Sequence, residues 1–250
     1  GGVELDVITY NAAISASEKC GKWEVSLGCL LELGDRRLTP DVITFNAAIS
    51  ACEKGRQWAQ ALGLFLQVAR QRLRADTVAF NSTISALEKG QQWRHALSLC
   101  FDAGRCLRLR RDVTSYNAVV SACEYVQRWD VALGVLREMG RERLAPDVVT
   151  HNTTISALEK GWRWERALSE FGAMRQSALQ PDSITYCATV DACRRALRWA
   201  HSLALFGEMY KEAVRREALV LDSVLGACEA GQQWAPLAGV RQGFSSSPGH

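Results

Sequence analysis

Several classes of protein are excluded by what this sequence lacks. No run of about 18 apolar residues occurs, so no membrane-spanning helix is predicted. The four histidines form no cluster, no glycine-rich phosphate-binding loop is present, and no serine or cysteine has a recognisable catalytic partner. We therefore predict no catalytic site, no metal site, no cofactor and no enzymatic activity.

A strong charge of either sign is also missing. The net charge is only +3, which permits a nucleic-acid partner but does not by itself argue for one. Hydrophobic residues make up 48% of the chain, enough for a continuous core. The nine cysteines are an odd number without metal-like pairing, so a reducing compartment is the simpler expectation.

What the sequence does contain is a repeat of about 35 residues. Seven of the eight tryptophans recur with this period, and only Trp162 falls outside the series: Trp23, Trp58, Trp93, Trp129, Trp164, Trp199 and Trp234. Two more series keep the same period, namely Asn11, Asn46, Asn81, Asn117 and Asn152, and Asp41, Asp76, Asp112, Asp147 and Asp182. One extra residue falls between Trp93 and Trp129. We expect it in the stretch Gly104–Arg111, because loops tolerate insertions better than helices.

Each repeat is expected to form two helices. Between Val42 and Asp76, apolar residues recur at helical spacing in two sets, the second opened by Trp58. Gly55 is suited to ending the first helix, and proline in several equivalent loops stops the second. Neither helix can bury its apolar stripe alone, so stacked pairs would share one core. We expect the in-phase tryptophans to pack between helices and Trp162 to lie on the surface.

One repeat position indicates a small buried core site. It holds Cys52, Cys123, Cys193 and Cys228, with Ser17, Leu87 and Leu158 in other repeats. Free cysteine behaves as a small hydrophobe, so we predict that these cysteines pack in the core.

These motifs resemble the pentatricopeptide repeat family, of the P type. The segment DVITFNAAISACEKG from Asp41 to Gly55 looks like the start of such a repeat, and Pro146 with Asp147 fits its end. The resemblance covers almost the whole chain. It implies an all-α fold, a right-handed α-solenoid of tandem helix–turn–helix repeats whose first helices line the concave face. The implied partner is single-stranded RNA, recognised at one nucleotide per repeat and running 5′ to 3′ along the array.

In this register the complete repeats are residues 7–41, 42–76, 77–112, 113–147, 148–182 and 183–217. We expect residues 1–6 to be the remnant of an upstream repeat, residues 218–242 a partial seventh repeat, and residues 243–250 a disordered tail. Asp6 already stands where an aspartate closes a repeat. We therefore expect that an upstream repeat, and any targeting segment with it, has been removed.

The resemblance implies that the fifth and the last residue of a repeat select the base. The base-reading pairs are then Asn11 with Asp41, Asn46 with Asp76, Asn81 with Asp112, Asn117 with Asp147, and Asn152 with Asp182. The family's code assigns asparagine with aspartate to uridine, with cytidine second. The sixth repeat departs from this pattern, because it offers Cys187 with Glu217, and no base is assigned to it.

The chemistry of these side chains suits the assignment. Unstacked RNA bases are read on their Watson–Crick edges, where uracil presents an N3–H donor between two carbonyl acceptors. An asparagine amide has both a donor and an acceptor, and an aspartate, which only accepts, can hold the amide and fix its orientation. Cytosine inverts part of this edge, so discrimination is predicted to be partial. The alternative is that the asparagines cap helices, although Asp6 or Thr9 is better placed to do so.

Two further series have two interpretations each. In the family, the second residue of a repeat sandwiches neighbouring bases, and the alternative is ordinary helix packing: Ile8, Ile43, Val78, Thr114, Val149 and Ile184. Basic residues near the end of each first helix either contact phosphate, as the family suggests, or complement a helix C-terminus: Lys19, Lys54, Lys89, Lys160 and Arg195. Tyr125 and Ala230 interrupt this series. Phosphate contacts would make binding salt-dependent.

The sequence thus predicts binding of uridine-rich or pyrimidine-rich single-stranded RNA in organellar RNA processing, stability or translation. The alternative is a protein-binding α-solenoid of the tetratricopeptide type, whose period is 34 residues and whose pattern differs. The His-x-Glu and Cys-x-x-Cys motifs of the zinc deaminase appended to some family members do not occur. Family resemblance suggests a mitochondrion or chloroplast, although no residue shows it.

Overall fold

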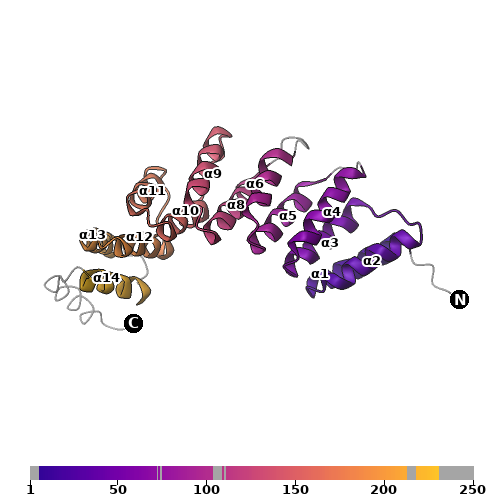
Figure 1. The fold of residues 1–250 in the computed structure, drawn as a ribbon, viewed down its shortest axis with the longest axis horizontal. Helices are drawn as coiled ribbons and strands as arrows, with labels where there is room; N and C mark the ends of the chain where they lie inside the picture. The colour runs from indigo at the N-terminus through magenta and orange to yellow at the C-terminus, as the bar shows by residue number, and fades with distance from the viewer. Residues whose placement is uncertain are drawn as a thin grey trace. The chain divides into compact units, whose positions relative to one another are not determined.

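A computed structural model describes residues 6–71, 73, 75–103, 109, 111–212 and 218–230. All regular secondary structure in these residues is helical (Figure 1). The chain forms two compact units, residues 1–126 and 127–250. None of the described helices is long and apolar enough to cross a membrane.

Helices alternate in both units between a first helix, which except for α14 follows an aspartate, and a second helix that begins with tryptophan. The first unit contains α1 (Val7–Lys19), α2 (Trp23–Asp35), α3 (Val42–Lys54), α4 (Trp58–Arg70), α5 (Thr77–Lys89), α6 (Trp93–Ser98), the π-helix η1 (Leu99–Ala103) and α8 (Val113–Tyr125). The second unit contains α9 (Trp129–Arg141), α10 (Val148–Lys160), α11 (Trp164–Gln176), α12 (Ser183–Arg195), α13 (Trp199–Lys211) and α14 (Ala218–Ala230).

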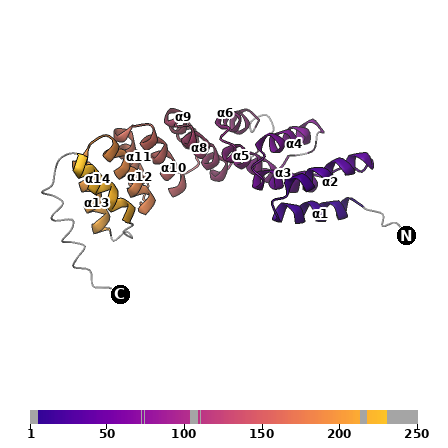
Figure 2. The same cartoon turned by 60° about the horizontal axis from the view of Figure 1, so that its bottom comes forward.

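The first helices form a row in each unit. In the first unit α1 contacts α3, α3 contacts α5 and α5 contacts α8, while α2 and α4 each pack against their own first helix and the next one (Figure 2). In the second unit α10, α12 and α14 form the row, with α11 and α13 packed on it in the same way. Each unit is therefore a stack of helix pairs, the α-solenoid architecture predicted from the repeat.

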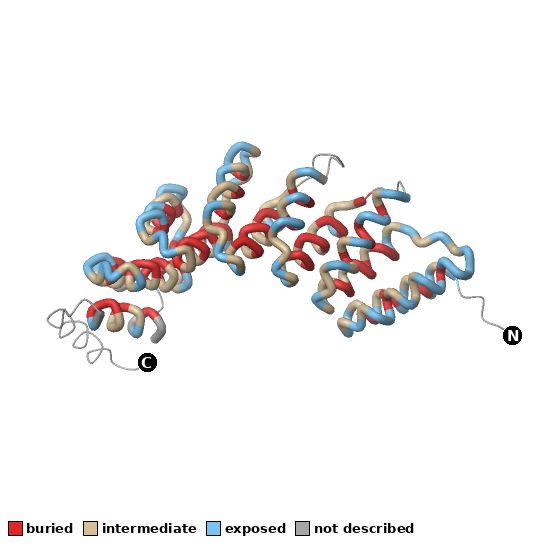
Figure 3. The backbone as a smooth tube through the Cα atoms, in the orientation of Figure 1, coloured by how far each residue is buried: buried red, intermediate tan, exposed pale blue. Residues whose placement is uncertain are grey.

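The core of each stack lies between the two layers of helices (Figure 3). Phe65 of α4 meets Phe80 of α5 at a ring distance of 6.2 Å, and Phe171 of α11 meets Tyr186 of α12 at 5.2 Å. These contacts join consecutive repeats, so the core continues from one repeat to the next. Burying one such side chain contributes about 1.5–3 kcal/mol.

The cysteine position is buried, as predicted. The four cysteines and their leucine equivalents have no exposed surface, and Ser17 is nearly buried as well: Cys52, Cys123, Cys193, Cys228, Leu87 and Leu158. Burial raises the pKa of the Cys52 and Cys193 thiols to about 11, which leaves them protonated at neutral pH. These cysteines are packing residues with little thiolate character.

The in-phase tryptophans Trp23, Trp58, Trp93, Trp129, Trp164 and Trp199 open the second helices and are half-buried, as the packing interpretation requires, whereas Trp162 is exposed, and Trp234 lies outside the described residues. A Cβ atom added at Gly55 would collide with the Trp23 indole, and Gly90 stands in the same relation to Trp58. Gly55 ends α3, but with an ordinary negative φ of −78°, and the left-handed residue is the next one, Arg56, at φ 56°. The glycine therefore serves to admit the indole. It does not supply the left-handed backbone expected of a glycine cap.

The 36-residue repeat differs from the others inside its second helix. Its loop Gly104–Arg111, where we expected the extra residue, lies mostly outside the described residues. Ahead of it, Leu99–Ala103 forms a π-helix, whose turns take more residues than α-helical turns. Phe101 lies eight residues after Trp93 and contacts Tyr116, with a distance of 6.0 Å between the ring centroids. The equivalent residue of the second repeat, Phe65, lies seven residues after Trp58 and contacts Phe80. The one-residue offset has thus occurred before the loop.

Candidate nucleic-acid interface

The aspartate that closes each repeat is the N-cap of the following first helix. The Asp41 carboxylate accepts a hydrogen bond from the Thr44 backbone N–H at 2.8 Å, and Asp76 and Asp182 cap α5 and α12 in the same way. Asp6 caps α1. The asparagines lie one turn into these helices, so the interpretation of the asparagines as helix caps is wrong.

The same aspartates also hold the asparagine of the repeat that they close. The asparagine Nδ2 atom donates to the carboxylate at 3.4 Å for Asn11 and Asp41, 2.7 Å for Asn46 and Asp76, 3.0 Å for Asn81 and Asp112, and 3.1 Å for Asn152 and Asp182. The predicted partners thus lie side by side in four repeats. Each carboxylate can fix the orientation of one amide, because it offers only acceptors.

One predicted pair, Asn117 with Asp147, stays a prediction, and the sixth repeat was assigned no base. Asn117 lies in α8 of the first unit, whereas Asp147 caps α10 of the second unit. In the sixth repeat, Cys187 lies in α12 with its thiol 3.9 Å from Asp191 Oδ2, and Glu217 is outside the described residues.

We call each contact between an asparagine and the aspartate that holds it an Asn–Asp junction. A third side chain completes three of the four junctions. The hydroxyl at the third position of the following helix approaches the asparagine Oδ1 atom: Thr44 to Asn11 at 2.5 Å, Ser115 to Asn81 at 2.6 Å, and Thr185 to Asn152 at 2.6 Å. Sequence reasoning missed this residue. The available signal was a threonine or serine recurring two residues before the next repeat's asparagine.

Hydrogen bonding outweighs burial at two of the carboxylates. Burial acts to raise the pKa of Asp41, but the hydrogen bonds from Thr44 and the Asn11 amide lower this pKa below its usual value. Asp112 has a lowered pKa in the same way, through Ser115 and Asn81. Both carboxylates are therefore ionised acceptors at neutral pH.

The residues predicted to sandwich bases are exposed. Ile8, Ile43, Val78, Val149 and Ile184 are each between 56% and 76% exposed, and Thr114 is exposed as well. This excludes the alternative that they are buried in ordinary helix packing. A row of exposed large apolar side chains next to the Asn–Asp junctions offers flat contacts to an unstacked base.

Three members of the basic series make ion pairs between repeats. Lys54 Nζ lies 2.9 Å from Glu18 Oε1, Lys89 Nζ lies 2.9 Å from Glu53 Oε1, and Arg195 Nε lies 2.8 Å from Glu159 Oε1. A serine of the same helix donates to the same glutamate oxygen in two cases: Ser50 to Glu18 and Ser85 to Glu53, both at 2.8 Å. This pairing was not among the interpretations drawn from the sequence.

Tyr125 interrupts the ladder of ion pairs, with an electrostatic consequence. It stands where Lys54 and Lys89 stand in earlier repeats, so the sequence offers Glu88 no basic residue at that position. Burial raises the pKa of Glu88, and a hydrogen bond from Ser121 only partly opposes this. The position is thus less favourable to a carboxylate than that of Glu18, whose pKa burial acts to raise but the contacts with Lys54 and Ser50 lower.

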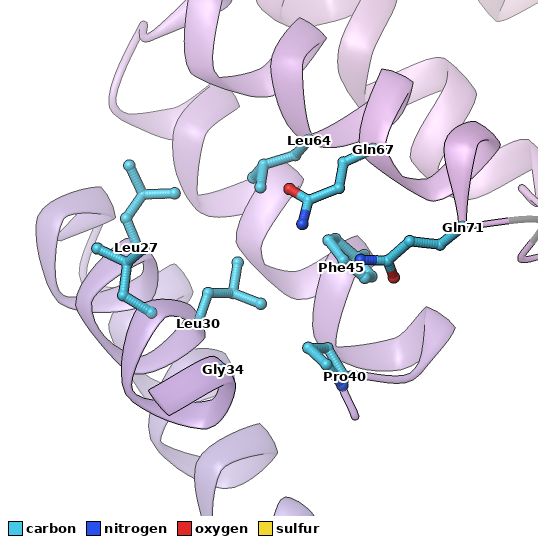
Figure 4. Close-up of a pocket in the computed structure, with 9 residues that line it drawn as sticks. Leu27, Leu30, Gly34, Pro40, Phe45, Leu64, Gln67 and Gln71 are labelled. Carbon is cyan, nitrogen blue, oxygen red and sulfur yellow. The ribbon is translucent and has the colours of Figure 1, made fainter. Parts of the chain in front are cut away.

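A pocket lies among the helices α2, α3 and α4, and no ionisable side chain lines it. Figure 4 shows Leu27 and Leu30 of α2 across from Leu64 and Gln67 of α4. Nor do the described ranges contain any group of histidine, cysteine and carboxylate side chains arranged to hold a metal ion. The Asn–Asp junctions are accordingly the best candidate site.

The protein is built from stacked helix pairs. The aspartate that caps a first helix holds the asparagine of the repeat before that helix, and this arrangement defines a helical-repeat protein with a modular binding face. Three family models match the sequence: the PPR repeat family at residues 111–160 and 146–195, the pentatricopeptide repeat domain at 1–54, and the PPR repeat at 43–72. Together they span more than half of the chain. The chain belongs to the pentatricopeptide repeat family.

Solved structures agree with this fold. The pentatricopeptide repeat protein PPR10 from maize matches with a TM-score of 0.79 at 19% identity, over 99% of this chain and 35% of that one. PPR10 in complex with an 18-nt psaJ RNA element gives a TM-score of 0.55 at 16% identity, over 99% of this chain and 41% of that one. This chain therefore spans well under half of PPR10.

A third structure is more distant in sequence. The PPR domain of Arabidopsis thaliana protein-only RNase P 1, in complex with tRNA, has a TM-score of 0.63 at 9% identity and covers 72% of this chain and 95% of that one. No curated protein matches the sequence.

Proposed function

We propose that this chain binds single-stranded RNA along the first helices of each unit, with a preference for uridine over cytidine and for pyrimidines over adenosine. The observation that carries the proposal is the Asn–Asp junction, found with the same partners in four repeats and bordered by exposed apolar side chains. Related proteins of the same fold have been solved with RNA, PPR10 with an 18-nt psaJ element and the RNase P domain with tRNA.

The geometry suits recognition of a pyrimidine edge. The aspartate takes one of the two amide hydrogens of the asparagine, which leaves one N–H for the base. The carbonyl oxygen has two lone pairs, so it can accept from the base as well as from the hydroxyl of the next helix. Uracil can accept from that N–H and donate its N3–H to the carbonyl. Adenine is larger and presents a different donor and acceptor order on its Watson–Crick edge, so it is expected to bind less well.

Phosphate contacts would come from the basic series. Lys54 and Lys89 already pair with glutamates, so a phosphate would share or replace an existing ion pair. Their side chains stay about 40% exposed, which leaves the ammonium groups accessible to the RNA backbone. Binding should then weaken as salt is raised.

A mobility-shift or anisotropy titration with ten-residue oligo-U, oligo-C and oligo-A tests the proposal directly. We expect affinity to decrease in the order U, C, A. A single good hydrogen-bonded contact is worth about 1 kcal/mol, so several repeats acting together should separate U from A by well over tenfold. Equal affinity for all three oligonucleotides would refute base reading. Failure to bind any of them would favour the protein-binding alternative.

We further propose that the chain acts as a binding module, without catalysis of its own, in the processing, stability or translation of organellar transcripts. The support is family membership alone. Crosslinking the tagged native protein to RNA in cells, followed by fractionation of mitochondria and chloroplasts, tests both the compartment and the class of transcript. Recovery only with cytosolic messages would contradict the organellar role.

A further inference from the structure

One of the four described junctions is built differently from the others. Asn46 donates to Asp76 at 2.7 Å, but its Oδ1 atom is buried and has no hydrogen-bond partner. The residue that should supply a hydroxyl is Ala79, which is itself fully buried at the third position of α5. Equivalent junctions have Thr44, Ser115 and Thr185 in this place.

In the junctions that contain a hydroxyl, this hydroxyl donates its proton to the asparagine carbonyl oxygen rather than to the aspartate. Ser115 Oγ lies 2.6 Å from Asn81 Oδ1 and 2.8 Å from Asp112 Oδ1, and it has a single proton to donate. Both distances fit an O–H···O hydrogen bond, and the contact with the amide oxygen is the shorter of the two. The carboxylate of Asp112 already accepts from the Ser115 N–H and the Asn81 amide. The hydroxyl therefore donates to the amide oxygen.

Two restraints then act on one amide. The aspartate binds the nitrogen end and the hydroxyl binds the oxygen end, so both the plane and the direction of the amide are fixed before RNA arrives. Asn46 has the first restraint only. The amide can pivot about its hydrogen bond to Asp76 and bring the carbonyl oxygen out of its buried position to a donor, since a buried acceptor without a partner is costly to leave as it is.

We propose that the hydroxyl at the third helix position is a positioning residue for pyrimidine discrimination, and that Ala79 makes the Asn46 junction the tolerant one. This inference rests on the proposed RNA-binding function. Uracil and cytosine place their hydrogen-bond donor at different points of the same edge, N3–H in uracil and the exocyclic N4–H in cytosine. An asparagine carbonyl that is restrained at both ends of its amide can meet only one of these two donors. An asparagine carbonyl whose amide is restrained at the nitrogen end alone can move to meet either donor.

The test measures one ratio, the dissociation constant for oligo-C divided by that for oligo-U. A homopolymer places the same base at every junction, so the ratio multiplies over the repeats and needs no knowledge of which nucleotide meets which repeat. We expect Ala79→Thr to raise the ratio about threefold above that of Ala79→Val, as fits one modest hydrogen bond. Valine has the shape of threonine without the hydroxyl and so controls for packing.

The reverse change provides a second variant should Ala79→Thr fold poorly. Ser115→Ala and Thr185→Val should each lower the ratio about threefold, and Thr185→Ser should restore it, because only the hydroxyl matters. Thermal melts monitored by circular dichroism confirm that the variants compared are folded. A merely structural role would lower affinity for both oligonucleotides alike and leave the ratio unchanged.

The outcomes separate the two proposals. If the wild-type protein prefers oligo-U, but Ala79→Thr matches Ala79→Val and Ser115→Ala matches the wild type, the positioning role is refuted and base reading stands. If the wild type binds oligo-U, oligo-C and oligo-A equally, the base-reading function fails and this inference fails with it.

Discussion

At the scale of single residues, the aspartates perform two tasks at once. Asp112 caps α8 through the Ser115 N–H at 2.8 Å and holds the Asn81 amide at 3.0 Å. A substitution there is expected to affect folding and recognition together. The two effects can be separated because asparagine caps a helix about as well as aspartate, whereas alanine does not.

Replacing Asn81 by Ser together with Asp112 by Asn changes the reading pair to one that the family's code assigns to adenosine. We expect the cap to survive and preference at one position to move from uridine towards adenosine. The measurement is binding to uridine tracts with a single adenosine scanned along them. One position should become favourable in the variant alone.

The control for this recoding is Asp112→Ala. It should cost about 1 kcal/mol of stability through removal of the cap and create no preference for adenosine. If the double variant still treats adenosine as the wild type does at every position, the assigned register is incorrect.

At the scale of helices and turns, the sequence alone predicts most of the structure. The helix pairs, the tryptophans at the start of second helices and the buried cysteine position all follow from apolar periodicity, which depends on residues close in the chain. The hydroxyl contacts and the ion pairs between repeats were not predicted. Thr44 lies 33 residues from Asn11, and Lys54 lies 36 residues from Glu18, so no local pattern reveals either pair.

The glycines at the ends of first helices illustrate the same limit. Gly55 was correctly placed at a helix end, but its reason lies in the Trp23 indole of the preceding repeat. Likewise the π-helix η1 was not predicted, because loops usually tolerate an inserted residue better than helices, although Phe101 stands eight residues after Trp93 where Phe65 stands seven after Trp58. In both cases tertiary packing decides.

Gly90→Ala should therefore destabilise the protein, since the added methyl group would collide with Trp58 at three atoms including its Cβ. The expected decrease is about 1–3 kcal/mol, the usual cost of overpacking. Chemical denaturation followed by circular dichroism measures it. Gly63→Ala in α4 is the matched control, because nothing lies near its added Cβ. That change should stabilise by about 0.5–1 kcal/mol. A gain at both sites would contradict the role assigned to the indole.

At the scale of the whole molecule, charge is arranged as a ladder of ion pairs between neighbouring repeats. Exposed pairs of this kind contribute about 0–1 kcal/mol each, so the ladder adds little to stability. Its larger effect would be on a polyanion, which the lysines attract and the glutamates repel. The net charge of +3 hides this local balance.

Lys54→Gln with Lys89→Gln should weaken binding of every oligonucleotide by a similar factor. The slope of log affinity against log salt should fall by about 0.7 for each single-strand phosphate that a lysine no longer neutralises. Titrations at several salt concentrations measure both quantities. The complementary variant, Glu18→Gln with Glu53→Gln, keeps the lysines and removes their partners, so we expect it to strengthen binding. Unchanged affinity in both variants would assign the lysines to the ion pairs alone.

The hydroxyl that reaches back from one helix to the preceding asparagine has a consequence for how such arrays are rearranged. A cassette of residues 42–76 carries Asn46 and Asp76, but the third member of that junction, residue 79, belongs to its neighbour. The cassette contributes Thr44 in turn to the junction of Asn11. When duplication or engineering moves one cassette, it alters the stringency of the cassette before it. A repeat's specificity is thus partly a property of its successor, and libraries built by shuffling should vary pairs of consecutive repeats.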